Sequence, residues 1–381
     1  MPKKTPKRTP QKTIAIAGGG TGGHVFPGLA VAHAVRNLAD VRIVFLGSPR
    51  GIEQRTVPQH GYELELLDVE PMSGGGVSRA IRGAWVAAKA MQTALAMARR
   101  LAPAVVLSVG GYAAGPASLA CVLEHVPLAV LETNAVPGLA NRLLVPFATR
   151  VFTAFPGLFR GPKTRMLGVP LRPGFVPKPY APREGERRVL VLGGSLGAEA
   201  LNERVPEAIA RAASTITDHV HVLHQAGKGS EAVRAKYNEV GLRDVRVAEF
   251  LDDVSDRIAQ ADVIIARAGA GSVAEITAIG RPTIFVPFPH ATADHQAKNA
   301  QALAAKGGAI CIRQEIADEN RLATELVKLL GDRDAASRMA DVARAHGRPS
   351  AASDIARDLL AMAGIVATPP CAANAGSKEL V

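Results

Sequence analysis

The 381-residue sequence is poor in aromatic residues and cysteine, and each shortage argues against a class of protein. Aromatic residues make up only 4% of the chain, so its basic stretches lack the interleaved aromatic side chains typical of nucleic-acid-binding surfaces. We therefore expect no nucleic-acid partner. Cys121, Cys311 and Cys371 are isolated and odd in number. They lack metal-ligand spacing, which predicts a reducing compartment and no cysteine-bound zinc.

Acidic residues are absent from two stretches, residues 1–12 and 71–123, and each stretch holds five basic residues. Together these account for ten of the eleven excess positive charges. Around Trp85 the second stretch mixes basic and apolar residues at helical spacing, which leaves two interpretations open. One is an amphipathic crossover helix whose apolar side faces the core. The other is a helix lying on an anionic membrane surface.

Charged residues are also absent from residues 101–123, a run long enough to resemble a membrane span. Pro103, the Gly110-Gly111 pair and Pro116 interrupt it, so we predict a strand, a turn and a helix instead. The basic N-terminus has no long apolar segment behind it, which argues against a signal peptide.

Four short hydrophobic runs each end in a glycine-rich turn and lead into a helical pattern; they are residues 14–17, 105–109, 189–192 and 263–266. Glycines after a buried strand let backbone approach a ligand closely, and the following helix presents its N–H groups there. The construction favours a phosphorylated ligand. Because it occurs in both halves, we predict an α/β protein with two Rossmann-like, doubly wound domains facing across a cleft.

Composition along the chain predicts the domain boundaries. Four prolines lie close together after residue 172, which is typical of an interdomain linker. The predicted parts are a disordered basic arm (1–12), an N-terminal domain (13–172), a linker (173–186), a C-terminal domain (187–347) and a disordered tail (367–381).

The glycines of residues 18–23 satisfy the G-x-G-x-x-G dinucleotide pattern, which alone is weak. An NAD site would need an acid after the second predicted strand, residues 41–46, and none is there. Arg50 would suit a 2′-phosphate, which keeps an NADPH-dependent reductase open. His24 follows the glycines, where it would open a helix and face the cleft; the alternative is a histidine that is merely solvated.

Two residues of the second domain have both a structural and a functional interpretation. Ser195, after Gly193-Gly194, could help to bind a phosphate or could simply cap a helix. Glu275 completes a Ser-x-x-Glu capping box with Ser272, or it could accept hydrogen bonds from both hydroxyls of a nucleotide ribose. The pattern alone favours the cap.

Polar residues are dense between residues 287 and 299, just past a predicted strand, and such a stretch suits recognition of sugar hydroxyls. Metal binding by His290, Asp294 and His295 is an alternative, but zinc-like spacing is absent. No Asp-x-Asp follows a strand either. We therefore expect neither a catalytic metal nor a cofactor.

Taken in order along the chain, these motifs resemble those of the MurG family of peptidoglycan N-acetylglucosaminyltransferases. The resemblance spans residues 13–365 and rests on the whole series, since each motif alone is weak. The matching segments are residues 19–30, Gly110-Gly111-Tyr112, Gly115-Pro116, Glu132-Thr133-Asn134, residues 168–172, Gly193-Gly194-Ser195, residues 267–275 and residues 294–299.

The resemblance implies a GT-B fold in which a C-terminal helix, residues 348–366, crosses back to the N-terminal domain. It implies transfer of GlcNAc, with inversion, from UDP-GlcNAc to the MurNAc 4-hydroxyl of undecaprenyl-pyrophosphoryl-MurNAc-pentapeptide. The reaction would take place on the cytoplasmic face of the plasma membrane. Implied partners are an anionic membrane surface and proteins of cell-wall synthesis and division.

The resemblance also implies roles for individual residues in the first domain. Thr21, Gly22, Gly23 and Asn134 would line the donor cleft. The acceptor would be bound by Gly110, Gly111 and Tyr112.

For the rest of the donor, Arg172 and Ser195 would hold the diphosphate. The Leu251 backbone would read uracil, and Gln296 would bind GlcNAc hydroxyls. Sugar and ribose would be held by a turn made of Ala270, Gly271, Ser272, Val273, Ala274 and Glu275. The resemblance thus moves Glu275 toward the ribose role.

Three positions depart from the family pattern. Leu131 and Thr133 replace polar residues that the family often has beside Glu132 and Asn134, and Leu196 replaces a glutamine. We therefore expect no family-like side-chain contacts at residues 131, 133 and 196.

The chemistry implied is one displacement at the anomeric carbon through an oxocarbenium-like transition state. Helix-end N–H groups, Ser195 and Arg172 would meet the charge on the departing UDP. His24 would be the general base for the acceptor hydroxyl, or would instead bind the acceptor diphosphate. A reductase and a non-catalytic sugar-nucleotide binder are the competing functions.

Overall fold

The computed structural model describes residues 11–68, 77–194 and 197–367, and for residues 77–88 it describes the backbone only. Within this part the chain forms two compact units. The first contains residues 11–133, 137–172 and 350–367, and the second contains residues 134–136 and 173–349. Ser195, the arm before residue 11, the side chain of Trp85 and the tail after residue 367 lie outside the described residues.

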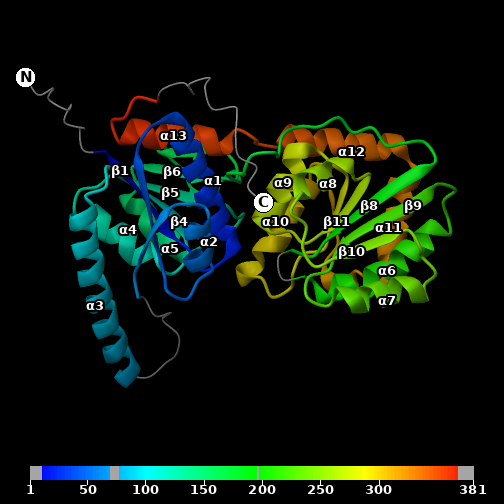
Figure 1. The fold of residues 1–381 in the computed structure, drawn as a ribbon, viewed down its shortest axis with the longest axis horizontal. Coiled ribbons are helices and arrows are strands. Elements are labelled where there is room, and N and C mark those ends of the chain that lie inside the picture. The colour runs from blue at the N-terminus through cyan, green and yellow to red at the C-terminus, as the bar shows by residue number, and fades with distance from the viewer. Residues whose placement is uncertain (1–10, 69–76, 195–196, 368–381) are drawn as a thin grey trace, which may run out of the picture. The chain divides into compact units, whose positions relative to one another are not determined.

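The first unit is built on a parallel sheet with the strand order β3-β2-β1-β4-β5-β6-β7, of which Figure 1 labels β1, β4, β5 and β6. Its strands are β1 (Thr13–Gly18), β2 (Arg42–Gly47), β3 (Glu63–Leu66), β4 (Val105–Gly110), β5 (Leu128–Glu132), β6 (Arg150–Thr153) and β7 (Thr164–Met166). All six residues of β1 are buried, as expected for a central parallel strand that is covered on both faces.

Helices cover both faces of this sheet, because alternate strand residues point to opposite sides. Ile14 and Ile16 pack in one core with α1 (Gly22–Leu38) and α13 (Ala351–Met362). Ala15 and Ala17 pack in the other core with α3 (Val77–Leu101) and α4 (Ala114–Leu123). The shorter helices are α2 (Glu53–Gln59), α5 (Leu139–Leu144) and the 3-10 turn η1 (Val145–Phe147).

The helix α13, which follows the second unit in the sequence, belongs to the first unit. Lys12 donates hydrogen bonds from Nζ to the carbonyl oxygens of Ala363, at 2.8 Å, and Gly364, at 3.0 Å. Asp358 of α13 forms an ion pair with Arg165 of β7. The first unit is therefore completed by residues that lie more than 180 positions after its last strand.

The second unit is built on another parallel sheet, with the strand order β10-β9-β8-β11-β12-β13. The strands are β8 (Glu186–Leu192), β9 (His219–Gln225), β10 (Val245–Ala248), β11 (Val263–Ala266), β12 (Thr283–Phe285) and β13 (Ile310–Cys311). The helices are α6 (Glu199–Ala213), α7 (Ser230–Glu239), α8 (Val254–Gln260), α9 (Ala270–Ile279), α10 (His295–Ala304), α11 (Glu319–Gly331) and α12 (Arg333–His346), with short turns η2 (Thr292–Asp294) and η3 (Gln314–Ile316).

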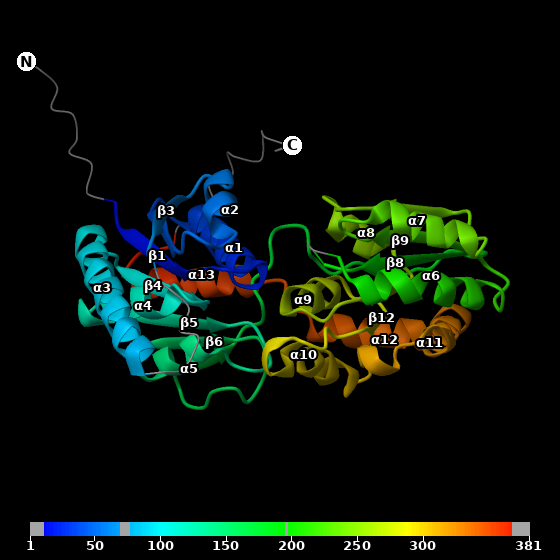
Figure 2. The same ribbon diagram turned by 90° about the horizontal axis from the view of Figure 1, so that it is seen from below.

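The basic stretch around Trp85 forms α3, which runs along α4 (Figure 2). From residue 89 onward its apolar side is buried in the core of the first unit, through Ala90, Ala94, Met97 and Leu101. The crossover-helix interpretation is therefore confirmed for this half of the helix. The uncharged run after residue 101 forms β4, a turn and α4, as predicted, and none of the helices among the described residues is both long and apolar enough to cross a membrane.

Candidate functional site

Two glycine loops meet at the carboxyl ends of β1 and β4, the point where the strand order of the first sheet reverses. Ligands bind at this position in open α/β sheets. Gly18 has φ 144° and Gly111 has φ 91°. A Cβ on Gly18 would overlap the Gly110 carbonyl oxygen, and one on Gly111 would overlap that of Gly19. Only glycine therefore allows the two loops to pack backbone against backbone.

His24 lies between these loops, in the first turn of α1. Its Nδ1 is 3.1 Å from the Thr21 hydroxyl oxygen, and a Cβ on Gly110 would come within 3.1 Å of its Nε2. If Nδ1–H donates to the hydroxyl, the ring presents a basic lone pair at Nε2, on the Gly110 side. The structure thus brings together Thr21, His24, Gly110 and Gly111, and Tyr112 beside them is 70% exposed.

Glu132 fixes the loop that follows β5. This buried carboxylate accepts hydrogen bonds from the Gly138 N–H at 2.9 Å and from Asn141 Nδ2 at 3.0 Å. Asn141 also donates to the Leu131 carbonyl, and its Oδ1 accepts a bond from Ser108. The Leu131 side chain is fully buried in the core. The leucine that departs from the family pattern at this position therefore serves in core packing.

Glu53 is a residue of this site that the sequence patterns did not indicate. Its carboxylate, 1% exposed, accepts hydrogen bonds from the Gly20 N–H at 2.7 Å and from the Ser48 N–H and hydroxyl at 3.0 Å each. Cβ atoms on Gly19 or Gly51 would overlap this carboxylate. Glu53 therefore ties the glycine loop after β1 to the turn after β2.

Replacing Glu53 with glutamine is expected to lower the free energy of unfolding by about 1–3 kcal/mol. A glutamine has one oxygen for these donors, and its NH2 would face N–H groups that also need an acceptor. Activity should fall as well, because the glycine loop that precedes His24 loosens. Thermal unfolding and turnover would be compared with those of Glu63→Gln, which removes an exposed carboxylate paired with Arg42 and should cost less than about 1 kcal/mol. Equal stability of the two variants would contradict this role.

In the second unit, the candidate donor residues also gather at the carboxyl edge of the sheet. Gly193 follows β8 and its N–H bonds the Gln225 carbonyl at the end of β9. A Cβ on Gly197, which has φ 79°, would overlap the Ala226 carbonyl. Gly193 and Gly197 are therefore both held close to the end of β9. Leu251 comes after β10 at the same edge, and its side chain is buried.

The helix α9 begins at Ala270 with Gly269 as its N-cap. Ser272 thus lies inside the first turn, so the capping-box interpretation of Ser272 and Glu275 is wrong. Arg267, just before this turn, donates to the Val286 and Pro287 carbonyls and to the Gln314 side chain. Burial lowers the pKa of this guanidinium to about 10, so it stays charged and fixes the loops after β11 and β12.

Asn299 joins three segments of the second unit. Its Oδ1 accepts from the Ala135 N–H at 2.8 Å, and its Nδ2 donates to the Ala268 carbonyl at 3.2 Å and the Asn134 side chain at 3.4 Å. Asn134 therefore lies beside the α9 turn, within the second unit. Gln296, in the first turn of α10, accepts a bond from the Phe288 N–H at 3.0 Å.

Asp294 pairs with Arg313 at 2.6 Å, and His295 Nδ1 lies 2.8 Å from the Thr292 carbonyl oxygen. Among the described residues, the group of side chains placed to share one metal ion does not include His290, Asp294 or His295. The metal-binding alternative for this loop is therefore not supported.

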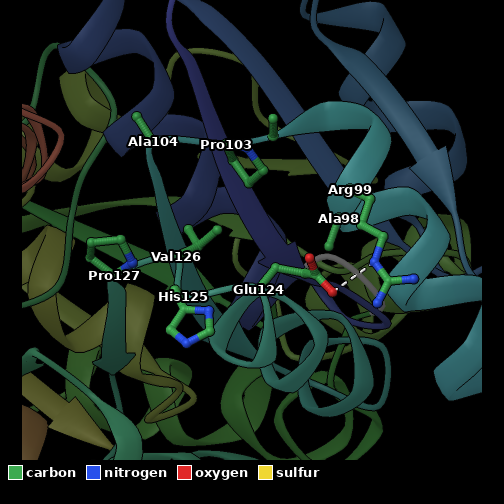
Figure 3. Close-up of a pocket in the computed structure, with 9 residues that line it drawn as sticks. Ala98, Arg99, Pro103, Ala104, Glu124, His125, Val126 and Pro127 are labelled. Atoms are coloured by element: carbon green, nitrogen blue, oxygen red, sulfur yellow. Dashed lines mark hydrogen bonds and ion pairs between the residues drawn. The ribbon is translucent and has the colours of Figure 1, made fainter.

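A hollow of about 420 Å³ lies away from all these residues, at the amino ends of β4 and β5 (Figure 3). Its lining includes Pro103, His125 and Pro127. Arg99 and Glu124 also line it, and their side chains pair with each other at 2.8 Å. Because ligand sites of open α/β sheets lie at the carboxyl edge, we assign no function to this hollow.

Two family models match the chain. The glycosyltransferase family 28 N-terminal domain matches residues 14–153, and the C-terminal domain of the same family matches residues 188–355. The chain is similar to the crystal structure of Acinetobacter baumannii MurG, with a TM-score of 0.81, 32% identity, and coverage of 92% of this chain and 99% of that one. With the two Rossmann-like units, this confirms the predicted α/β fold of the GT-B type.

Similar curated proteins include two named UDP-N-acetylglucosamine--N-acetylmuramyl-(pentapeptide) pyrophosphoryl-undecaprenol N-acetylglucosamine transferase. The Sorangium cellulosum protein is 50% identical over 359 residues, covering 92% of this chain and 88% of its own. The Halorhodospira halophila protein is 42% identical over 351 residues, covering 91% and 97%. The chain therefore belongs to glycosyltransferase family 28 and, within it, to the family of these MurG transferases.

Proposed function

We propose that this protein is an inverting glycosyltransferase of peptidoglycan synthesis. It moves GlcNAc from UDP-GlcNAc to the MurNAc 4-hydroxyl of undecaprenyl-pyrophosphoryl-MurNAc-pentapeptide. The observation that carries the proposal is the 50% identity, over 92% of the chain, to a transferase with that name. The glycine loops and the α9 turn, each at the carboxyl edge of its sheet, support it.

The donor is bound mainly by the second unit. N–H groups of the loop at residues 193–197 and of the first turn of α9 meet the diphosphate, with Ser195 and Arg172. Glu275, in the second turn of α9, accepts hydrogen bonds from the ribose hydroxyls. The Leu251 backbone reads uracil, which agrees with the burial of its side chain.

The sugar of the donor is held by polar groups of the α9 turn and α10. The Gln296 amide is oriented by its bond from the Phe288 N–H and binds GlcNAc hydroxyls. Residues 270–274 and Asn134 complete the pocket for the sugar, and Thr21, Gly22 and Gly23 of the first unit also take part in binding the donor.

The acceptor is bound by the first unit, at Gly110, Gly111 and Tyr112. His24 removes the proton of the MurNAc 4-hydroxyl through Nε2 while the Thr21 hydroxyl holds Nδ1. As the hydroxyl oxygen attacks the anomeric carbon from the face opposite UDP, the bond to the diphosphate breaks and the configuration inverts. Helix N–H groups and Arg172 stabilise the negative charge that develops on the departing UDP.

An assay with UDP-GlcNAc and a lipid-linked MurNAc-pentapeptide acceptor tests the proposal. We expect release of UDP together with a disaccharide-lipid product, and no reaction with NADPH. UDP-GlcNAc binding without transfer would instead indicate a non-catalytic binder. A change in NADPH absorbance would indicate a reductase.

We further propose that the protein works on the cytoplasmic face of the plasma membrane as a peripheral enzyme. In the first unit, α5 and η1 expose Leu139, Leu143 and Phe147, at 70%, 64% and 56%, with the basic Arg142 among them. Apolar side chains flanked by positive charge suit an anionic lipid surface. The basic helix α3 belongs to the same unit.

Leu143→Glu is expected to weaken binding to anionic liposomes by about tenfold, because it places a carboxylate in the lipid interface. The control is Ile316→Glu in the second unit, where the isoleucine is also 64% exposed. Liposome flotation at low and at high salt measures the membrane binding of both variants and of the wild type. Binding of the wild type that is insensitive to salt and lipid charge would contradict the proposal.

A further inference from the structure

Two of the three histidines of β9 lie side by side at its amino end. His219 and His221 are two positions apart in the strand, so their side chains point to the same face. Their ring centroids are 4.7 Å apart. His224 lies on the opposite face, between Tyr237 and Asn202. Burial lowers the pKa of His224 to about 3, so that ring is a neutral core residue, separate from the two outer histidines.

Asp244 completes a group with the two outer histidines. Its Oδ2 lies 2.6 Å from His221 Nδ1 and 3.1 Å from His219 Nε2. The backbone holds this arrangement, because Asp244 directly precedes β10 and its carbonyl accepts a bond from the Val222 N–H. Among the described residues, these three form the group whose ligand atoms all lie within 4.8 Å of one another.

We propose that His219, His221 and Asp244 form a surface site for a divalent transition-metal ion, with zinc as the expected occupant. Two imidazole nitrogens and a carboxylate oxygen are a ligand set that zinc uses in proteins. Tetrahedral zinc holds its ligand atoms about 3.3 Å apart, so the Asp244 oxygen has to move about 0.7 Å away from His221 Nδ1 and about 0.2 Å away from His219 Nε2. His219 and Asp244 are 64% and 50% exposed, which allows this movement and leaves the fourth position to water.

The charges around the site are of both signs. On the neighbouring strand β8, Glu186 pairs in register with His219 and Arg188 with His221. Arg188 is itself 3.4 Å from the Glu186 carboxylate, which also pairs with Arg183 at 3.6 Å, so its charge is partly offset.

The site is also separate from the donor loop. It lies at the amino end of β9, whereas Gln225, which accepts the bond from Gly193, ends the strand about 13 Å beyond His221.

Zinc titration of the full-length, untagged protein tests the proposal, after treatment with a chelator and its removal. We expect one zinc ion to bind with saturation and to raise the melting temperature, because an ion bound to the folded state stabilises it. The double variant His219→Gln/His221→Gln should lose this ion, and Asp244→Asn should bind it at least tenfold more weakly. His60→Gln, which removes an exposed histidine of the first unit, should bind like the wild type.

Cobalt provides a second readout, because the visible absorption of bound Co2+ reports its ligands and should disappear in the double variant. His219 and Asp244 are exposed and His221 is half-buried, and glutamine and asparagine are close in size to the residues they replace, so the variants should melt near the wild-type temperature without metal. The proposal is wrong if the wild type shows no saturable binding, or if the double variant binds zinc as the wild type does. It is also wrong if Cys311→Ser loses the ion while the histidines are intact.

Discussion

Replacing His24 with alanine is expected to lower kcat by roughly 10²–10⁴-fold, the usual contribution of a general base. His24 Nδ1 is held 3.1 Å from the Thr21 hydroxyl, and Nε2 lies against Gly110, where we place the acceptor. A general base must be deprotonated to work. The wild-type rate should therefore fall toward acid pH, and His24→Ala should lose this acid limb of the pH–rate profile.

Two further variants make the result specific to His24. Thr21→Val removes the hydroxyl that holds Nδ1 and should cause a smaller loss of kcat, because the base remains but is less well oriented. His60→Ala removes an exposed histidine of the same unit and should leave the kinetics unchanged. If His24→Ala keeps the acid limb and mainly raises the KM for the acceptor, His24 binds the acceptor diphosphate and is not the base.

Replacing Arg172 with alanine is expected to lower kcat by roughly 10- to 150-fold. A charge-assisted hydrogen bond contributes about 1.5–3 kcal/mol, and each 1.36 kcal/mol of barrier corresponds to a factor of ten. The loss should appear in kcat more than in the KM for UDP-GlcNAc, because charge on the diphosphate grows as the glycosidic bond breaks.

Arg172→Lys separates charge from geometry. It keeps a positive charge but loses the planar fork that binds two oxygens at once, so its activity should lie between those of the wild type and Arg172→Ala. Arg160→Ala, which removes another exposed arginine of the first unit, is the matched control. Unchanged turnover in Arg172→Ala would show that other groups neutralise the departing diphosphate.

The central strands and glycine turns could be predicted because their signal is local. Runs such as residues 14–17 and 263–266 are buried on both faces, so each is continuously apolar and stands out in the sequence. The strands β3 and β13 carry a weaker signal. In β3, Glu63 and Leu66 are exposed at a sheet edge, and β13 is only two residues long.

The contacts that fix the candidate site could not be predicted from local patterns. Glu53 acts through backbone N–H groups of two different loops, one of them 33 residues away, and nothing in its own neighbourhood indicates those partners. The same is true of the Asn134–Asn299 contact, which joins positions 165 residues apart. For Glu275 a local pattern was misleading. The Ser-x-x-Glu sequence predicted that a helix begins just after Ser272, but α9 begins at Ala270.

The proposed mechanism depends most on how the leaving group is stabilised. We assign that task to main-chain N–H groups, a serine hydroxyl and the Arg172 guanidinium, with no divalent cation, because no Asp-x-Asp follows a strand. The most direct test is GlcNAc transfer measured after exhaustive chelation, in the wild type and in His219→Gln/His221→Gln, so that an ion bound at the surface site is not mistaken for a catalytic one. We predict that both proteins keep their full rate. Loss of activity on chelation, restored by magnesium or manganese in both, would contradict the mechanism.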